Sequence, residues 1–131
     1  GVNGIESYLE GATPQSSYTD PLGSGSTGAV STITVKWNDR DSEEIRLERI
    51  ITQKWIALWP LGQEAWSEYR RTGYPKLFPI APGISPNIPV ANRIPFPTTE
   101  FTRNTENVNE AVQKLGGNGY DTKIWWQRTD K

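Results

Sequence analysis

Glu64 and Glu68 have the residue type and close spacing that acid–base chemistry could use. A glycosidase uses two carboxyl groups that face each other across the substrate. Positions i and i+4 of one helix instead place these two side chains next to each other, and Arg71 is spaced to neutralise Glu68. We therefore interpret the glutamates as part of a structural ion network, and we do not expect an enzyme.

The composition removes most other catalytic and metal chemistry. The 131 residues contain no cysteine and no histidine, so Ser-His-Asp triads, cysteine nucleophiles and the common zinc sites are excluded within them. We expect no metal and no cofactor. The formal net charge is −1, with neither sign forming a block, which argues against nucleic acid as a partner. No apolar run is long enough to span a bilayer.

Glu64 and Glu68 lie in the stretch QEAWSEYRRTGYPKLFP, residues 63–79, which predicts a short helix and its exit. The helix should run over 63–72, with Gly73 as a left-handed C-terminal cap and Tyr74-Pro75 preventing its continuation. Trp66 shares a face with Tyr69 and Arg70, which permits aromatic packing and a cation–π contact. The stretch could serve as a ligand platform or as a structural clamp, and its charges and cap favour the clamp.

A longer helix is predicted over 41–58, with Asp41 as N-cap and Glu44 as its reciprocal capping partner. Apolar residues fill a wide arc of this helix, so it should pack on several sides. The polar strip is narrow and consists of Arg46, Arg49 and Gln53.

Two further helices flank these central ones. Residues 2–9 have helical spacing and stop before Gly11. Asn104 or Thr105 should cap a further helix, which ends at Gly116-Gly117. The apolar stripe of the latter comprises Val108, Ala111, Val112 and Leu115.

The remaining segments predict irregular structure with little β. Residues 12–32 form a flexible loop or insertion rich in Ser, Thr, Gly and Pro, residues 33–37 alternate like a short strand, and residues 75–99 form an ordered proline-rich segment. A PxxP ligand in the last segment is an alternative. If the tail is extended, the side chains of Trp125 and Trp126 should point in opposite directions, and at least one of them should be buried.

Three strings in this order resemble the C-terminal region of the SusD/RagB family. They are ITQKWIALWPLGQEAWSEYRRTGYPKLFP, NRIPFPTTEFTRNTENVNEAVQKLGG and YDTKIWW, and the resemblance covers about residues 45–126. It implies a mainly α fold, with residues 1–131 as one SusD-like C-terminal domain from a larger protein with tetratricopeptide-like helix pairs. The absence of Met and the opening Gly1 also favour an excised piece of a longer protein.

The resemblance also implies a function. Family members are surface lipoproteins of Bacteroidetes-type outer membranes that capture glycans, without catalysis, for a SusC-like TonB-dependent transporter. A lipid anchor on an N-terminal cysteine would then lie outside these residues, and the protein would sit on the extracellular face of the outer membrane. The alternative is a helical scaffold that contacts the transporter without touching glycan. Tyr18, the lone aromatic residue of the 12–32 loop, is the candidate sugar contact because its ring offers a flat apolar face.

Overall fold

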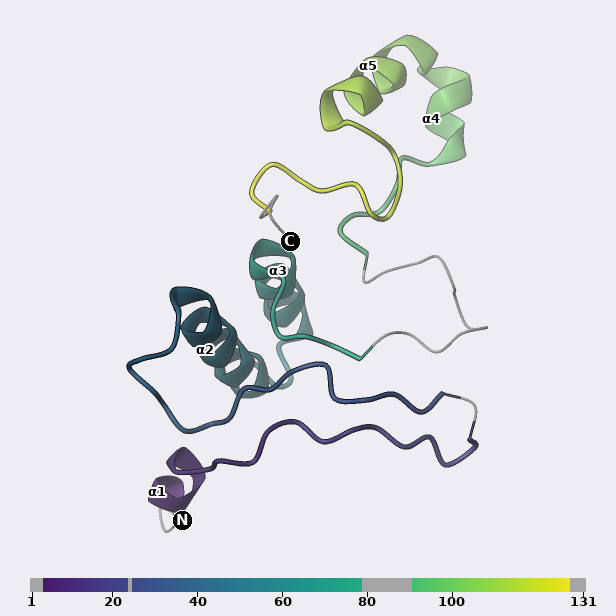
Figure 1. Cartoon of the computed structure of the whole chain (residues 1–131). Coiled ribbons are helices and arrows are strands. Elements are labelled where there is room, and N and C mark those ends of the chain that lie inside the picture. The colour runs from purple at the N-terminus through teal and green to yellow at the C-terminus, as the bar shows by residue number, and fades with distance from the viewer. Residues whose placement is uncertain (1–3, 24, 79–90, 128–131) are drawn as a thin grey trace. The chain divides into compact units, whose positions relative to one another are not determined.

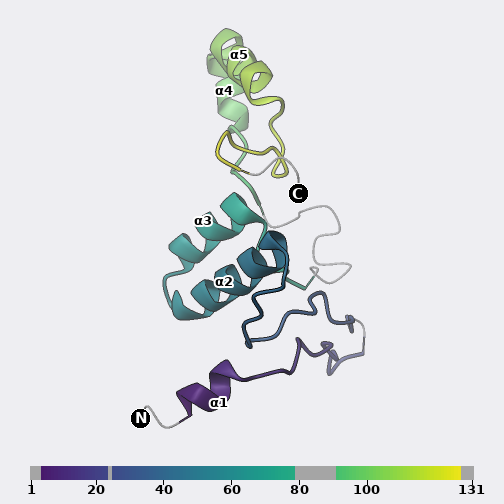
Figure 2. The ribbon, with the colours of Figure 1, turned by 60° about the vertical axis from the view of Figure 1, so that its left-hand side comes forward.

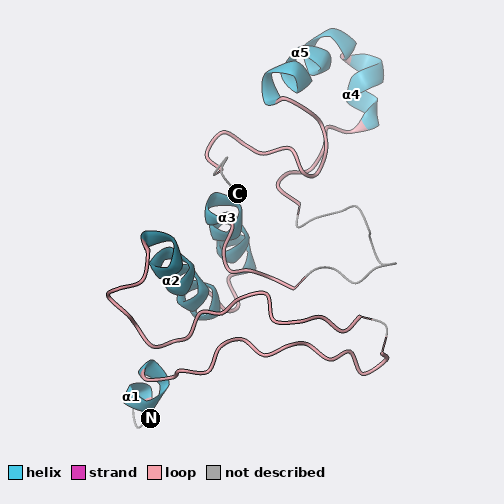
Figure 3. Ribbon diagram, viewed as in Figure 1, coloured by secondary structure: helices cyan, strands magenta, loops and turns pink. Residues whose placement is uncertain are grey.

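The computed structural model describes residues 4–23, 25–78 and 91–127. The chain divides into two compact units, Gly1–Pro79 and Ile80–Lys131. The described residues form helices joined by long irregular segments, without a β-strand (Figures 1 and 3). The mainly α fold that the sequence predicts is therefore confirmed. In the described ranges, no helix has both the length and the apolar character needed to cross a membrane.

A helix hairpin forms the centre of the first unit. Helices α2 (Glu43–Ala57) and α3 (Gly62–Thr72) lie side by side and antiparallel (Figure 2). Trp55 meets Tyr69 edge-on across the pair, with ring centroids 6.4 Å apart. Helix α2 begins two residues after its predicted start and ends one residue before its predicted end, and α3 begins one residue before its predicted start. Helix α1 (Ile5–Leu9) is the predicted N-terminal helix.

The start of α2 differs from the prediction. Ser42, not Asp41, is the N-cap, and its hydroxyl accepts a hydrogen bond from the Ile45 amide at 3.3 Å. Asp41 instead forms an ion pair with Arg49, and Glu44 accepts a hydrogen bond from the Tyr74 hydroxyl at 2.6 Å. Both acidic side chains therefore make tertiary contacts in place of the capping role.

Residues 11–37 form an irregular hairpin, which we call the 11–37 hairpin. Its two arms run antiparallel (Figure 1) and are joined where Lys36 N donates to Gly11 O and where Tyr18 and Thr27 exchange backbone hydrogen bonds. The predicted strand over 33–37 is wrong. The Thr34 and Lys36 carbonyls accept hydrogen bonds from the Arg49 guanidinium rather than from a neighbouring strand.

The second unit contains two short helices in contact with each other. Helix α5 (Thr105–Leu115) follows Asn104 and ends at Gly116 in the left-handed conformation, as predicted. Helix α4 (Thr98–Arg103), directly after Pro97, was not predicted. Val108 is the buried centre of the α5 stripe, and the other three stripe residues are half-buried.

The tail after α5 folds back onto residues 91–96. Asn118 Oδ1 accepts hydrogen bonds from Phe96 N at 2.8 Å and from the Arg93 guanidinium at 3.1 Å. Gln127, which is buried, donates to Asn92 Oδ1 at 2.8 Å.

Neither tryptophan of the tail is fully buried: Trp126 is half-buried and Trp125 is 94% exposed. The prediction of a buried tail tryptophan is therefore wrong, and Gln127 is the buried residue of this part of the tail. Residues 79–90 of the proline-rich segment lie outside the described residues.

Candidate functional site

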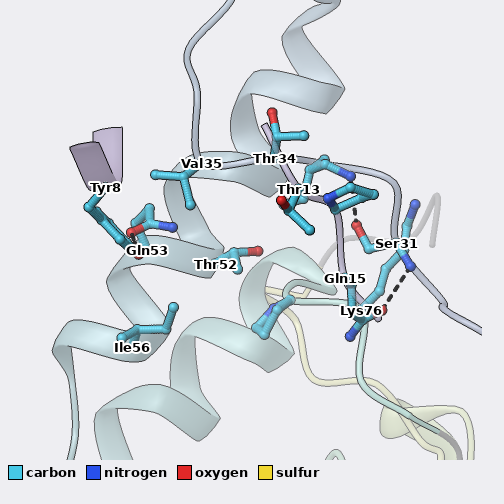
Figure 4. Close-up of a pocket in the computed structure, with 13 residues that line it drawn as sticks. Tyr8, Thr13, Gln15, Ser31, Thr34, Val35, Thr52, Gln53, Ile56 and Lys76 are labelled. Atoms are coloured by element: carbon cyan, nitrogen blue, oxygen red, sulfur yellow. Dashed lines mark hydrogen bonds between the residues drawn. The ribbon is translucent and has the colours of Figure 1, made fainter. Parts of the chain in front are cut away.

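A pocket of about 240 Å³ lies between α2, the 11–37 hairpin and the segment that leaves α3 (Figure 4). All of its lining residues belong to the first unit. One part of the wall is apolar and contains Pro14, Ile33, Val35, Ile56 and Pro75. The other part carries hydroxyl, amide and ammonium groups, chiefly those of Tyr8, Gln15, Ser31, Thr52, Gln53 and Lys76. An apolar wall with a few fixed polar groups is typical of a small-molecule site.

A buried carboxylate holds three parts of the pocket together. Glu48 of α2 is only 3% exposed and accepts a hydrogen bond from the Ser31 hydroxyl at 2.5 Å. Its second oxygen lies 3.1 Å from Lys76 Nζ. A buried charge requires such partners, so Glu48 fixes the hairpin and the α3 exit to α2.

Arg49 fixes the adjoining hairpin arm. It belongs to the predicted polar strip of α2, and only 6% of it is exposed. The guanidinium donates to Asp41 Oδ2 at 2.6 Å and to the Lys36 carbonyl at 2.5 Å, and it also donates to the Thr34 carbonyl. Because these groups belong to the hairpin and its exit, Arg49 takes the place of a strand partner.

Two glutamine side chains in the pocket have fixed orientations. Gln15 Oε1 accepts hydrogen bonds from Val30 N at 2.9 Å and from Ser31 N at 3.0 Å. Gln53 Oε1 accepts one from the Tyr8 hydroxyl at 2.7 Å. A glutamine amide has a carbonyl oxygen that accepts hydrogen bonds and an NH₂ group that donates them. Because protein donors bind the carbonyl oxygen of each glutamine, its NH₂ group is available to donate to another partner. Within the described ranges, neither NH₂ group donates to a protein atom.

Tyr18, the predicted sugar contact, lies outside this pocket. It is 46% exposed, and its ring centroid lies 6.0 Å from that of Phe78 at a 43° tilt. Beyond Tyr18 the hairpin turns at Asp20, whose carboxylate accepts hydrogen bonds from Leu22 N and Gly25 N. The structure thus places an exposed aromatic pair next to a tight polar turn. The role of Tyr18 stays a prediction.

The glutamates of α3 do not form a catalytic pair. Glu68 lies 2.8 Å from the Arg71 guanidinium and 3.2 Å from Lys54 Nζ, whereas Glu64 is exposed. The hydrogen bond from Arg71 and the nearby Lys54 hold the pKa of Glu68 below its usual value, despite an opposing contribution from burial. A carboxylate held ionised by two cations suits the predicted ion network.

The predicted clamp residues on α3 make the expected contacts. The Arg70 guanidinium carbon lies 3.5 Å from the Trp66 ring centroid, a cation–π geometry, and burial lowers the pKa of Arg70. Gly73 has φ 75° and ends the helix as predicted. In the described part of the chain, no cluster of three or more acidic side chains could hold a metal ion.

The pocket was not predicted from the sequence. Its walls come from α1, both arms of the 11–37 hairpin, α2 and the α3 exit. One feature of the sequence could have indicated it. Glu48 and Arg49 are charged residues beside a wide apolar arc, and a charged residue that is buried there needs partners from other segments.

The chain matches one protein family over nearly its whole length. The model of the SusD-like family, described as Susd and RagB outer membrane lipoprotein, matches residues 1–127. The chain therefore belongs to the SusD-like family, as the resemblance indicated. No curated protein matches the chain.

Solved structures of SusD homologues agree with this assignment. A homologue from Bacteroides uniformis is 48% identical, with a TM-score of 0.79 over 97% of this chain and 28% of its own. One from Bacteroides thetaiotaomicron is 46% identical, with a TM-score of 0.79 over 95% of this chain and 29% of its own. A chitin-binding SusD homologue from Flavobacterium johnsoniae is 39% identical, with a TM-score of 0.75 over 93% of this chain and 27% of its own. The chain thus spans less than a third of the length of these relatives.

Proposed function

We propose that this chain is part of a non-catalytic glycan-binding component of an outer-membrane uptake system. The observation that carries the proposal is its membership of an outer membrane lipoprotein family in which a 39% identical relative is described as chitin-binding. The neutralised Glu68 and the isolated Glu64 agree with a binding role, because neither offers an acid–base pair.

The full-length protein would act at the extracellular face of the outer membrane beside a SusC-like TonB-dependent transporter. The family description supports the membrane location. Because the 131 residues contain no cysteine, a lipid carried on a cysteine would be attached outside them.

Within these residues, Tyr18 and Phe78 are the proposed stacking surface for glycan. Their partly exposed rings lie 6.0 Å apart, and the neighbouring turn around Asp20 provides polar groups. A flat apolar face with polar groups beside it suits a sugar ring.

The test is glycan binding by the full-length protein. A glycan array followed by calorimetry should reveal at least one polysaccharide ligand, with no release of reducing sugar on incubation. Tyr18→Ala should then weaken binding, whereas Tyr120→Ala, which removes an exposed tyrosine from the second unit, should not. An array without any bound glycan would refute the proposal.

A second candidate function is a helical surface that contacts the transporter. The α2–α3 turn favours it, because Trp59 is 87% exposed and Leu61 is also exposed. Copurification of the transporter with wild-type protein but not with Trp59→Ser, while glycan affinity is retained, would support this alternative.

A further inference from the structure

The pocket of Figure 4 has the chemistry of a site for a single neutral sugar ring. Its two glutamines offer hydrogen-bond donors to a ligand. Protein donors hold both carbonyl oxygens, so the NH₂ groups of Gln15 and Gln53 are the ends left for a ligand. Each would donate to an oxygen lone pair. Sugar hydroxyl and ring oxygens are acceptors of this kind.

The charges of the pocket favour a neutral ligand. Lys76 is the charged residue among those that line it, and its ammonium lies 3.1 Å from the buried Glu48 carboxylate. At this distance, the attraction of the ammonium for an anionic ligand is largely cancelled by the repulsion of the carboxylate. An anionic ligand would therefore gain little from Lys76.

The apolar wall provides the other surface that a sugar needs. Ile33, Val35 and Ile56 line the pocket from the hairpin and from α2. The C–H face of a pyranose can pack against such side chains while its hydroxyl groups meet the amides.

The volume limits the ligand to about one ring. About 240 Å³ equals the share of roughly eight water molecules at ~30 Å³ each. Pockets for drug-sized ligands measure roughly 300–1,000 Å³, so a whole oligosaccharide would not fit.

We propose that this pocket binds the terminal ring of a neutral glycan, with Gln15 and Gln53 as amide donors and Ile33, Val35 and Ile56 as the apolar wall. This inference rests on the proposed function and gives it a specific subsite, separate from the surface of Tyr18 and Phe78.

The experiment uses the full-length protein and a panel of chito-, cello-, malto- and xylo-oligosaccharides, measured by calorimetry. Gln15→Glu and Gln53→Glu keep the oxygen that accepts the protein hydrogen bonds, but they remove the NH₂ donor. Each should weaken the bound oligosaccharide by about threefold to tenfold, the effect of one hydrogen bond. Gln113→Glu, the same change at an exposed site on α5, should leave the affinity unchanged.

A blocking pair provides a test that does not depend on the glutamines. Ile56→Trp places a large ring at the pocket and should reduce affinity more than tenfold, whereas Ile50→Trp, at an exposed site of α2 outside the pocket, should not. Thermal melting checks that the variants fold, and exposed Ile56 should tolerate its change even if a glutamine variant does not.

The outcomes separate this inference from the proposed function. If wild-type protein binds an oligosaccharide and Ile56→Trp and the glutamine variants bind it equally well, the pocket is not the subsite, although the glycan-binding function stands. If wild-type protein binds no member of the panel and no glycan on an array, both proposals are overturned.

Discussion

The Glu68 carboxylate of α3 pairs with Lys54 of α2, which joins the two helices, and with Arg71 of its own helix. Its pKa is held below 4.5 in the folded chain, chiefly by the hydrogen bond from Arg71. Because folding lowers the pKa of Glu68, the ionised Glu68 carboxylate stabilises the folded chain above about pH 4.5. This stabilisation is lost as the pH falls through the folded-state pKa of Glu68. We expect Glu68→Gln to lower the free energy of unfolding at pH 7 and to flatten the decline of that free energy as the pH falls below about 4.5.

Urea unfolding at several pH values would measure this difference. Glu64→Gln is the control, because Glu64 is exposed on the same helix and has no ion pair among the described residues. Parallel pH curves for wild type and Glu68→Gln would contradict the argument.

Trp66 and Trp125 differ in burial and should differ in their effect on stability. Trp66 is half-buried and stacks under Arg70 at 3.5 Å, whereas Trp125 is 94% exposed. Partial burial together with a cation–π contact suggests a loss of about 2 kcal/mol for Trp66→Ala. This is less than the roughly 3–5 kcal/mol of a fully buried tryptophan. Trp125→Ala should change the free energy of unfolding by less than about 0.5 kcal/mol.

Thermal and urea unfolding of both variants would check these values. If Trp66→Ala unfolds like wild type but the full-length variant loses glycan affinity, then the residue is a ligand platform and the clamp interpretation is wrong.

At the scale of the element, α3 depends on the glycine that ends it. Gly73 has φ 75°, a conformation that costs an L-residue about 1–2 kcal/mol. We expect Gly73→Ala to destabilise the chain by about 1 kcal/mol, and Gly73→Val to cost more because its side chain is β-branched. Gly62, at the other end of α3, has open space around it. Gly62→Ala should stabilise the helix by up to about 1 kcal/mol, and equal effects at the two glycines would refute the argument.

Local signals explain which elements the sequence predicted. Gly73 and Gly116 end α3 and α5 as the sequence predicted, and both have the left-handed conformation, which was predicted for Gly73. Residues 33–37 alternate like a strand, but a strand needs a partner, and here Arg49 supplies the donors instead. Helix α4 has only 6 residues and three threonines, so neither apolar periodicity nor intrinsic propensity indicates it.

The candidate site required the whole tertiary structure. Gln15 and Gln53 lie 38 positions apart, and no spacing rule relates two positions of a loop and a helix. Their NH₂ groups become available only because Val30, Ser31 and Tyr8 hold the opposite ends of the amides. The sequence could suggest Tyr18 as an isolated aromatic residue, but it could not show that Phe78 lies beside it.

At the scale of the whole molecule, the small core leaves much apolar surface exposed. The buried hydrophobic residues among those described are Ile51, Ala65, Tyr74 and Val108. At the α2–α3 turn, by contrast, Trp59 is 87% exposed beside a cavity of about 250 Å³ that Trp55 and Leu58 also line. Exposed apolar surface of this kind usually marks a contact with another chain or segment. The relatives of this chain are more than three times as long as the part that it matches.

We therefore expect the 131-residue chain to self-associate through the α2–α3 turn and to bind a hydrophobic dye. Replacing Trp59 and Leu61 together by serine should shift it toward monomer, because the change removes apolar area that water would otherwise surround. Leu22→Ser is the control, since Leu22 is equally exposed but belongs to the turn of the 11–37 hairpin. Sedimentation velocity over a range of concentrations, with dye fluorescence in parallel, measures both effects. A wild-type chain that stays monomeric at high concentration and binds no dye would show that the exposed turn is not a contact surface.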